Sequence, residues 1–182
     1  ADQYRPTLIL DEAETFLTPQ KSELIGILNA GHRRRSAYID RVEGNGKKRQ
    51  VRRFSAWSPK VVGLIGSIGK IRDTLRDRAI QITMRRKRVD EIVTRLLPDR
   101  HEAFVELNRK LARWAADNMG ALSAAGPTEI PGTLNDRQQD NWRGLIAIAD
   151  TVGGKWPALA RKAATLFAAI EDEESEIGMP HL

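Results

Sequence analysis

The sequence lacks several features that would narrow the class of protein at once. It contains no cysteine, which excludes a disulfide framework and any metal site built on thiolates. No apolar run approaches the roughly 18 residues that a membrane-spanning helix needs, and no signal-peptide pattern opens the chain. We find no internal repeat. We therefore expect a cytoplasmic globular protein without membrane association, built as one domain or as a core with a small appendage.

What is present is an uneven distribution of charge. The net charge is +6, and the chain ends in an acidic stretch that begins at Glu171. The basic clusters all lie in the first half of the chain, at residues 33–35, 47–49, 52–53 and 85–88. This asymmetry points to a polyanionic partner for the first half, although basic residues also serve as solubilising surface.

The most informative stretch is a short apolar run, residues 7–10, that is followed by two carboxylates. A run of this length predicts a buried strand, with Asp11 and Glu12 directly after its carboxyl end. Ligands bind at that edge of an open α/β sheet. One acid there can hold a hydrated Mg²⁺ ion, while its neighbour orients a water that attacks a phosphate. The alternative is a strand followed by a helix whose solvated first turn contains the same acids.

The rest of the first 88 residues predicts the back half of an α/β sheet domain. A helix over residues 22–29 should stop at Gly31. Two β-prone runs, 36–43 and 50–57, surround an Asn-Gly tip and predict a hairpin with a basic tip and a basic second arm. A buried strand over 59–66, a short helix or turn over 70–76 and an alternating strand over 79–84 should follow.

Residues 89–170 show a helical pattern that predicts an all-α lid. Helices are expected over residues 91–97 and 100–118, and the second has an apolar face made of Phe104, Leu107, Leu111 and Trp114. After a loop over 120–134, Asn135 or Asp136 should cap a helix that Gly153-Gly154 closes. Its inward stripe is predicted to be Trp142, Leu145, Ala149 and Val152. A last helix should cover 156–170, and the acidic tail, 171–182, is expected to be disordered.

Leu8-Ile9-Leu10-Asp11-Glu12 resembles the Walker B strand of a P-loop ATPase of the AAA+ type. The resemblance implies that Asp11 holds Mg²⁺ through water and that Glu12 polarises the attacking water. The ordered set of these acids with the basic hairpin and residues 29–33, 57–60, 74–78 and 136–143 resembles one family in particular. It is DUF3631, a domain of unknown function found in plasmid, prophage and actinobacterial proteins, often fused to primase or helicase-like modules.

Two arginines before the predicted strand 79–84 match, by the same resemblance, the arginine finger that reaches the nucleotide of a neighbouring subunit. Arg78 matches that position best, and Arg76 is the second candidate. A guanidinium suits a phosphate because it donates two parallel hydrogen bonds and keeps its charge. The spacing alone would also allow surface pairing with Asp73 or Asp77.

Two further residues could contact the nucleotide. Arg143 lies away from the apolar stripe of its predicted helix, as the sensor 2 arginine of AAA+ lids does, but Asp140 is placed to form an ordinary helix-surface bridge with it. Ser67 follows the predicted strand 59–66 and stands where the sensor 1 residue of AAA+ proteins lies, a position that usually carries a polar residue such as asparagine.

The hairpin resembles the pre-sensor-1 hairpin of AAA+ helicases and related initiators, which grips DNA. By that resemblance five cations would contact phosphates without reading bases: Lys47, Lys48, Arg49, Arg52 and Arg53. Binding to DNA would then be sensitive to salt and would not depend on sequence. The alternative is an exposed hairpin whose cations block the aggregation of strand edges.

An ATPase of this kind needs a loop of the form G-x-x-x-x-G-K-[ST], and the sequence contains none. We expect the loop upstream in a longer parent protein, so that this chain alone would not hydrolyse ATP. The hypothesis is therefore part of an ATP-hydrolysing, nucleic-acid-associated, helicase-like protein, with ATP and Mg²⁺ as cofactors and a homo-oligomeric assembly that shares nucleotide sites. The alternatives are a non-catalytic DNA- or RNA-binding module and a nucleotide-dependent signalling switch.

Overall fold

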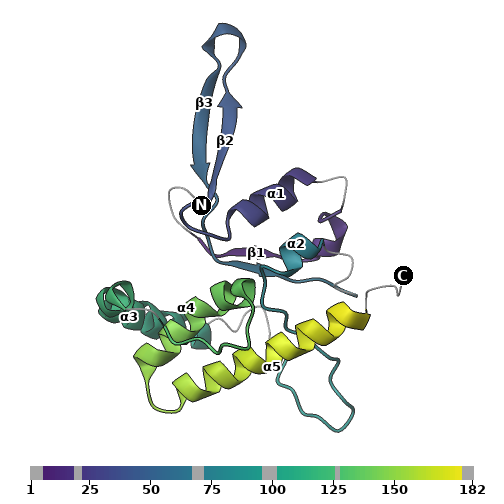
Figure 1. The fold of residues 1–182 in the computed structure, drawn as a ribbon, viewed down its shortest axis with the longest axis vertical. Coiled ribbons are helices and arrows are strands. Elements are labelled where there is room, and N and C mark those ends of the chain that lie inside the picture. The colour runs from purple at the N-terminus through teal and green to yellow at the C-terminus, as the bar shows by residue number, and fades with distance from the viewer. Residues whose placement is uncertain (1–5, 19–21, 67–71, 96–101, 126–127, 178–182) are drawn as a thin grey trace. The chain divides into compact units, whose positions relative to one another are not determined.

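The computed structural model describes residues 6–18, 22–66, 72–95, 102–125 and 128–177 (Figure 1). The chain divides into two compact units, residues 1–79 and 80–182. The first unit is a mixed α/β structure with two small sheets, and the second is helical. The boundary between the units therefore lies between Ala79 and Ile80. The sequence pattern instead places the boundary after residue 88. Among the described residues, no helix combines the length and the apolar character needed to span a membrane.

The first unit contains most of the short elements of the chain. In chain order they are β1 (Leu8–Leu10), a 3-10 helix (Ala13–Thr15), α1 (Ser22–Ala30), β2 (Tyr38–Glu43), a 3-10 helix (Gly46–Lys48), β3 (Gln50–Ser55), β4 (Lys60–Val62) and α2 (Asp73–Arg76). The second unit contains α3 (Glu102–Ala124), α4 (Asp136–Val152) and α5 (Trp156–Ile177). The predicted helix 22–29, the hairpin and the short helix within 70–76 are thus confirmed.

The strands β1 and β4 form a parallel pair, although α1 and the hairpin separate them in the chain. Leu8 lies opposite Lys60 and Leu10 lies opposite Val62. The pair and α1 enclose a small core whose buried residues are Ala13, Leu17, Ile25 and Leu28. The opposite face of the pair remains open, since Ile9 is 75% exposed and its partner Val61 is 55% exposed. The two predicted strands are therefore confirmed as strands, although β4 is shorter than expected. Their predicted burial is wrong, because no residue of either strand is buried and one face of the pair is open.

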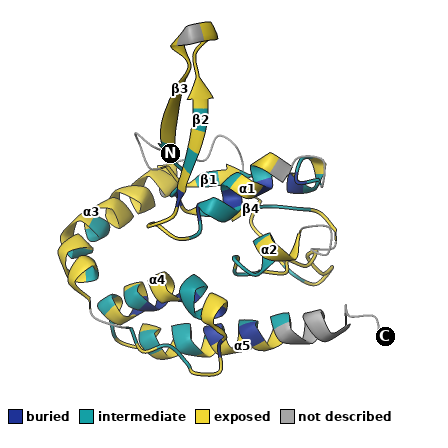
Figure 2. Ribbon diagram, turned by 45° about the horizontal axis from the view of Figure 1, so that its top comes forward, coloured by how far each residue is buried: buried dark blue, intermediate teal, exposed yellow. Residues whose placement is uncertain are grey.

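The strands β2 and β3 pair in antiparallel register, from Tyr38 opposite Ser55 to Glu43 opposite Gln50. Gly44 and Gly46 in the tip have φ angles of 100° and 58°, which glycine adopts at little cost. Most residues of both strands are exposed, so the hairpin projects with two solvated faces (Figure 2). The hairpin holds its shape by backbone pairing and by contacts across the strands rather than by a core.

One predicted strand is absent. Residues 79–84 form neither helix nor strand, and Ile82 and Met84 are 68% and 85% exposed. An alternating sequence becomes a strand only when a neighbouring strand accepts its backbone hydrogen bonds. No other strand pairs with this segment within the described part of the chain. The predicted helix over 91–97 is also wrong for its described part, because residues 91–95 are not helical.

The helix α4 begins as predicted. The Asn135 side chain accepts hydrogen bonds from the backbone N–H groups of Arg137 and Gln138, and the Gln138 side chain accepts one from the Asn135 N–H in return. This reciprocal arrangement is a capping box. At the other end the Gly153 N–H donates to the Ala149 carbonyl, and Gly153 has a φ of 74°. The predicted cap and the predicted glycine stop are both confirmed.

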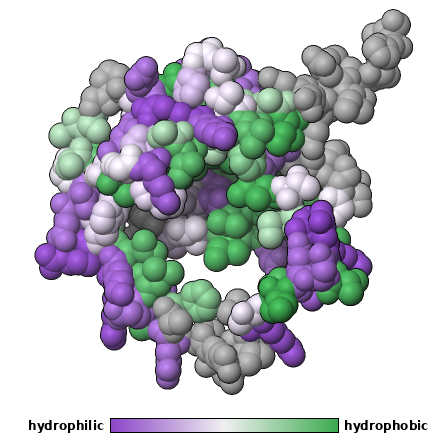
Figure 3. All heavy atoms as spheres, turned by 90° about the horizontal axis from the view of Figure 1, so that it is seen from below, coloured by the Kyte–Doolittle hydropathy of each residue, from purple (hydrophilic) through white to green (hydrophobic). Residues whose placement is uncertain are grey.

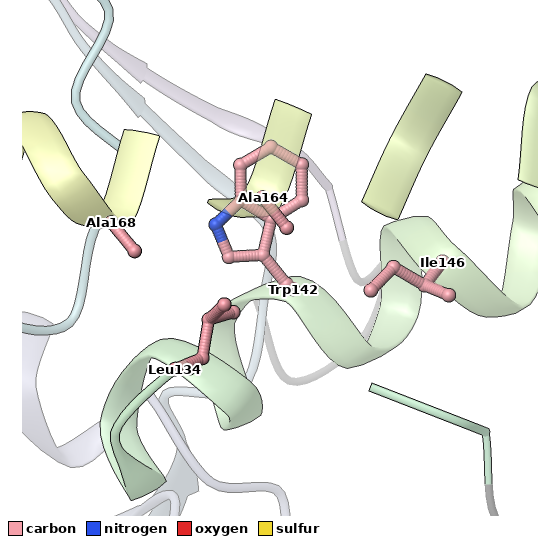
Figure 4. Close-up of a cluster of buried hydrophobic side chains, with 5 residues drawn as sticks. All are labelled: Leu134, Trp142, Ile146, Ala164 and Ala168. Carbon is pink, nitrogen blue, oxygen red and sulfur yellow. The ribbon is translucent and has the colours of Figure 1, made fainter. Parts of the chain in front are cut away.

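The core of the second unit lies between α4 and α5 (Figure 4). Its buried residues are Leu134, Trp142, Ile146, Ala164 and Ala168. The predicted stripe is partly wrong, because Ile146 is fully buried whereas Leu145 is 48% exposed and Val152 is 47% exposed. At about 100° per residue, Leu145 and Val152 lie about 60° and 80° away from the direction of Trp142. They therefore fall at the edge of the face that packs against α5.

Two helices run further than predicted. The helix α3 continues to Ala124, and its apolar face is open, with Phe104, Leu107 and Leu111 each about half exposed. The helix α5 continues to Ile177, over residues that the sequence pattern assigns to the acidic tail. On the face drawn in Figure 3, hydrophobic side chains reach the surface between charged ones.

Candidate functional site

Asp11 and Glu12 lie at the carboxyl end of β1, beside the end of β4. The Gly63 N–H donates to the Leu10 carbonyl over 2.8 Å, and the Ala13 N–H donates to the Gly63 carbonyl over 2.9 Å. These two bonds continue the parallel ladder past the ends of the strands. The acid pair is therefore held between two strand ends, the position that the sequence pattern predicts for it.

The backbone of Glu12 is unusual. It has φ 50° and ψ 43°, the left-handed region, and it is the one non-glycine residue with positive φ in the part of the chain that the structure describes. The Thr15 hydroxyl donates to the Glu12 carbonyl over 2.8 Å and the Asp11 Oδ1 accepts from the Glu12 N–H over 2.9 Å. This conformation carries a cost in most residues. It turns the chain sharply between β1 and the following 3-10 helix and leaves Glu12 exposed.

Gly63 leaves room for the acids. A Cβ at this position would lie 3.1 Å from the Asp11 Oδ1, tighter than ordinary van der Waals contact. Glu14 reaches across the same edge, because its Oε2 accepts from the Ile65 N–H over 3.1 Å. Asp11, Glu12 and Glu14 thus have different surroundings, and only Glu14 is tied to the segment that follows β4. Ser67, the predicted sensor 1 residue, lies outside the described residues.

The donor chemistry of this edge suits magnesium better than a softer metal. Mg²⁺ is commonly held by one or two carboxylates together with waters and the phosphates of its substrate. Asp11 and Glu12 are both exposed and supply such oxygens. No group of three or more histidine, cysteine or acidic side chains that could hold a metal ion occurs among the described residues.

The two candidate finger arginines lie at the end of α2 and after it. Arg76 pairs with Asp73 at 3.1 Å, one of the pairings that spacing allows. The Arg78 guanidinium donates to the Thr74 carbonyl, one helical turn earlier. Both side chains are partly buried and engaged within their own unit. To act as an arginine finger on the nucleotide of a neighbouring copy, Arg76 would have to leave Asp73, or Arg78 would have to leave the Thr74 carbonyl.

Arg143, the predicted sensor 2 residue, is exposed on α4. It lies 3.9 Å from Asp140, a distance at the limit of an ion pair. The expected helix-surface bridge is therefore present, and exposed pairs of this kind contribute little to stability. Asp140 also has a further interaction.

On the arms of the hairpin, Arg52 and Arg53 pair with carboxylates of the opposite strand. Arg53 donates to both oxygens of Asp40 over 2.8 and 3.0 Å, and Arg52 lies 3.3 Å from the Glu43 carboxylate. The hydrogen bond from Arg53 lowers the pKa of Asp40 below its ordinary value. Two of the five predicted phosphate contacts are therefore partly neutralised by neighbours on the same hairpin.

Aromatic rings support the same two arginines. The Arg52 guanidinium lies 4.8 Å from the centroid of the Phe54 ring, and Arg53 lies 5.9 Å from that of Tyr38. Both distances suit cation–π contacts. Composition and motifs do not identify these rings or the acids Asp40 and Glu43 as parts of the site. The register would have revealed them, because Asp40 stands directly opposite Arg53 once the hairpin is paired from its tip.

The tip differs from the arms. The side chains of Lys48 and Arg49 are exposed and have no partner among the described residues. The side chain of Lys47 lies outside what the structure describes. Among the described cations of the hairpin strands and tip, those without a carboxylate partner thus lie at the tip.

Lys60 fixes the base of the hairpin. Its Nζ donates to the carbonyls of Ser58 over 2.9 Å, Gly31 over 3.3 Å and Ala56 over 3.4 Å. Burial lowers the pKa of this amine. The contacts join the end of α1 to the segment between β3 and β4. The sequence pattern predicts no role for this lysine. Gly31 is required there, because a Cβ would overlap the Ala56 carbonyl and the Lys60 amine.

Comparison with known proteins concerns mainly the second unit. The sequence profile of a family described as "Protein of unknown function (DUF3631)" matches residues 83–181, more than half of the chain. The chain belongs to this family. The family match leaves out Asp11, Glu12, Arg78 and the hairpin and includes Arg143. The predicted membership in the DUF3631 family is thus confirmed.

A relative from Saccharopolyspora erythraea has the name "Uncharacterized 28.9 kDa protein in xis 5'region". It is 38% identical over 96 residues, which is 50% of this DUF3631 chain and 34% of the relative. The chain therefore spans about a third of the length of this curated relative. No solved structure matches the chain.

Proposed function

We propose that this chain is part of an ATP-hydrolysing, nucleic-acid-associated protein of the AAA+ type, similar to a helicase or a primase-associated motor. One observation carries the proposal. A projecting hairpin with a basic tip is built into the same unit as a parallel strand pair whose carboxyl end bears two adjacent acids. An acid edge for a nucleotide and a basic surface for a polyanion then belong to one compact body.

The acid edge would act on the nucleotide. Asp11 would hold Mg²⁺ through water, and Glu12 would orient the water that attacks the terminal phosphate of ATP. The left-handed backbone of Glu12 supports this role, because strained residues cluster at functional sites. The phosphate-binding loop must come from residues outside this sequence. In a homo-oligomer Arg78, or Arg76 in its place, would reach the nucleotide of the next copy, and Arg143 and Ser67 would contribute secondary contacts.

The hairpin would hold the nucleic acid. Lys48 and Arg49 are exposed and not paired with carboxylates, so they can contact phosphates at once, together with Lys47 from the same tip. Arg52 and Arg53 would add to these contacts only by leaving Glu43 and Asp40. Exposed ion pairs of this kind are weak, so a polyanion can compete for the two arginines. The contact would be to the backbone and would not depend on base sequence.

A second function is favoured by a different observation. The sequence contains no phosphate loop of the form G-x-x-x-x-G-K-[ST], whereas the hairpin with its basic tip is present in this chain. A non-catalytic nucleic-acid-binding module would need only the hairpin, and the acids would then end a strand without a chemical role.

Two measurements on the full-length protein separate the two functions. Glu12→Gln should abolish ATP hydrolysis while leaving ATP binding in place, because the amide cannot polarise water as the carboxylate does. Lys48→Ala with Arg49→Ala should weaken binding to single-stranded DNA. Lys110→Ala with Arg113→Ala is a matched control, since it removes the same charge from lysine and arginine that pair with Glu106 and Asp117 on α3.

The outcomes are distinct. A full-length protein that hydrolyses no ATP, with DNA binding lost in the hairpin variant, would support the binding module. ATP turnover that survives Glu12→Gln would contradict the catalytic role proposed for Glu12. DNA binding that falls equally in the hairpin variant and in the control would count against the hairpin in both functions, because only net charge would then matter.

A further inference from the structure

A second basic surface lies in the other unit, where the proposed function does not use it. Residues 84–93, here called the basic loop, contain four consecutive cations, Arg85 to Arg88. Figure 1 shows the segment as part of a long loop without helix or strand. It falls entirely within the residues that match the family, since that match begins at residue 83.

Glu91 holds the basic loop in one shape. Its carboxylate accepts two hydrogen bonds from the Arg85 guanidinium, one of them over 2.9 Å, and one from the Arg88 backbone N–H over 2.8 Å. The Lys87 amine donates to the Glu91 carbonyl over 2.8 Å. The Arg85 hydrogen bond lowers the pKa of Glu91, so this carboxylate stays charged well below neutral pH. One acid thus orders three of the four basic residues.

The ordered loop leaves two guanidinium groups uncommitted. The side chains of Arg86 and Arg88 are exposed and contact no partner within the described ranges. Between and beside the ordered residues, Val89 and Ile92 are 103% and 99% exposed. A loop ordered in advance loses less entropy when it binds. The same loop therefore presents charge together with apolar side chains that are almost fully exposed.

We propose that the basic loop binds the phosphate backbone of nucleic acid through Arg86 and Arg88, as a second contact surface separate from the hairpin. The inference rests on the nucleic-acid partner of the proposed function. Arginine suits phosphate because its planar fork donates two hydrogen bonds. Exposed aliphatic side chains next to such arginines resemble the wedges that enter a groove or separate bases. Two linked surfaces strengthen binding without any fixed arrangement between the units.

An anionic lipid surface is the less suitable partner. Lipid recognition by charge typically uses a cluster of about four to eight lysines and arginines, whereas Glu91 already engages Arg85 and Lys87 here. Two arginines are too few for stable attachment to a membrane, but they add directly to the hairpin contacts on one nucleic-acid strand.

The test measures how the affinity of the full chain for a DNA duplex depends on salt. Arg86→Ala with Arg88→Ala should make the slope of log K against log salt concentration shallower by about 1.8, because each lost phosphate contact removes about 0.9. The control is Lys110→Ala with Arg113→Ala, which removes the same charge from the same unit. All four side chains are exposed, and circular dichroism would verify that the variants fold.

The hairpin variant Lys48→Ala with Arg49→Ala separates this inference from the proposed function. A shallower slope in the loop variant but not in the control supports the inference. An unchanged slope in the loop variant, with a change in the hairpin variant, overturns the inference and leaves the proposed function standing. A chain that binds no DNA overturns both. Loss of binding to phosphatidylserine vesicles in the loop variant, with an unchanged DNA slope, would identify a lipid partner and overturn the inference.

Discussion

The two units of this chain are stabilised in different ways. In the first unit, β1 and β4 meet across about fifty residues of sequence, and the buried core consists of small and medium apolar residues under the strand pair. In the second unit, α4 and α5 are neighbours in the chain and pack Trp142 and Ile146 between them. The first unit depends on contacts between distant segments, and the second depends on local ones.

The residues that match the family and most of the candidate site residues lie in different units. The residues that match the DUF3631 family lie in the second unit. The acid pair, the candidate finger arginines and the hairpin all lie in the first. Membership in the family therefore says little about the candidate site, and the function proposed for the first unit must be tested on that unit's own residues.

The substitution that we expect to destabilise the protein most removes a side chain from the core of the second unit. Ile146→Ala should reduce the free energy of unfolding by about 2–5 kcal/mol, because it leaves a cavity at a fully buried position. Leu145→Ala is the matched control on the neighbouring, half-exposed residue and should cost much less. Urea unfolding followed by circular dichroism measures both. Equal losses would mean that the face of α4 was assigned wrongly.

A smaller effect is expected at the junction of the first unit. Gly31→Ala should destabilise the unit by about 1–3 kcal/mol, since the new Cβ would overlap the Ala56 carbonyl and the Lys60 amine. Gly26→Ala, inside α1 and with nothing within 4 Å of the new Cβ, should instead stabilise it by about 1 kcal/mol. Thermal unfolding of the two variants gives the comparison. A Gly31→Ala protein as stable as the parent would show that the junction is loose.

The smallest effect compares one ion pair from each unit. Arg161 donates to both oxygens of Asp150 over 2.6 and 3.0 Å, as Arg53 does to Asp40. In each pair the hydrogen bond from arginine lowers the aspartate pKa below 3.8. Each contribution to stability is therefore complete above that ordinary value and is lost as pH falls through the lowered pKa of the folded protein.

Carboxyl titration by NMR measures these pKa values. Arg161→Ala should return the pKa of Asp150 towards its ordinary value and leave Asp40 unchanged, whereas Arg53→Ala should do the reverse. The two variants serve as controls for each other. Aspartates that titrate at the ordinary value in the parent protein would contradict both pairings.

The sequence predicted the features that local chemistry decides. The Asn-Gly tip between two β-prone runs identified the hairpin, and Asn135 with Gln138 identified the start of α4. The prediction of a strand over 79–84 was wrong, because an alternating sequence supplies apolar side chains but no partner for the hydrogen bonds of the backbone. The predicted buried stripe of α4 was wrong at Leu145. Periodicity predicts the direction of the apolar face of a helix but not how much of that face a neighbouring helix covers.

Local sequence thus sufficed for the helix α1, for the start of α4, for the position of Asp11 and Glu12 at a strand end and for the basic character of the hairpin. Which of those charges are available follows from the folded arrangement instead. Arg52 and Arg53 pair with Glu43 and Asp40, whereas the side chains of Lys48 and Arg49 have no partner in the part of the chain that the structure describes, and Gly63 lies beside Asp11. The physical reason is that an ion pair or a close approach depends on the register between segments, which no property of either segment alone specifies.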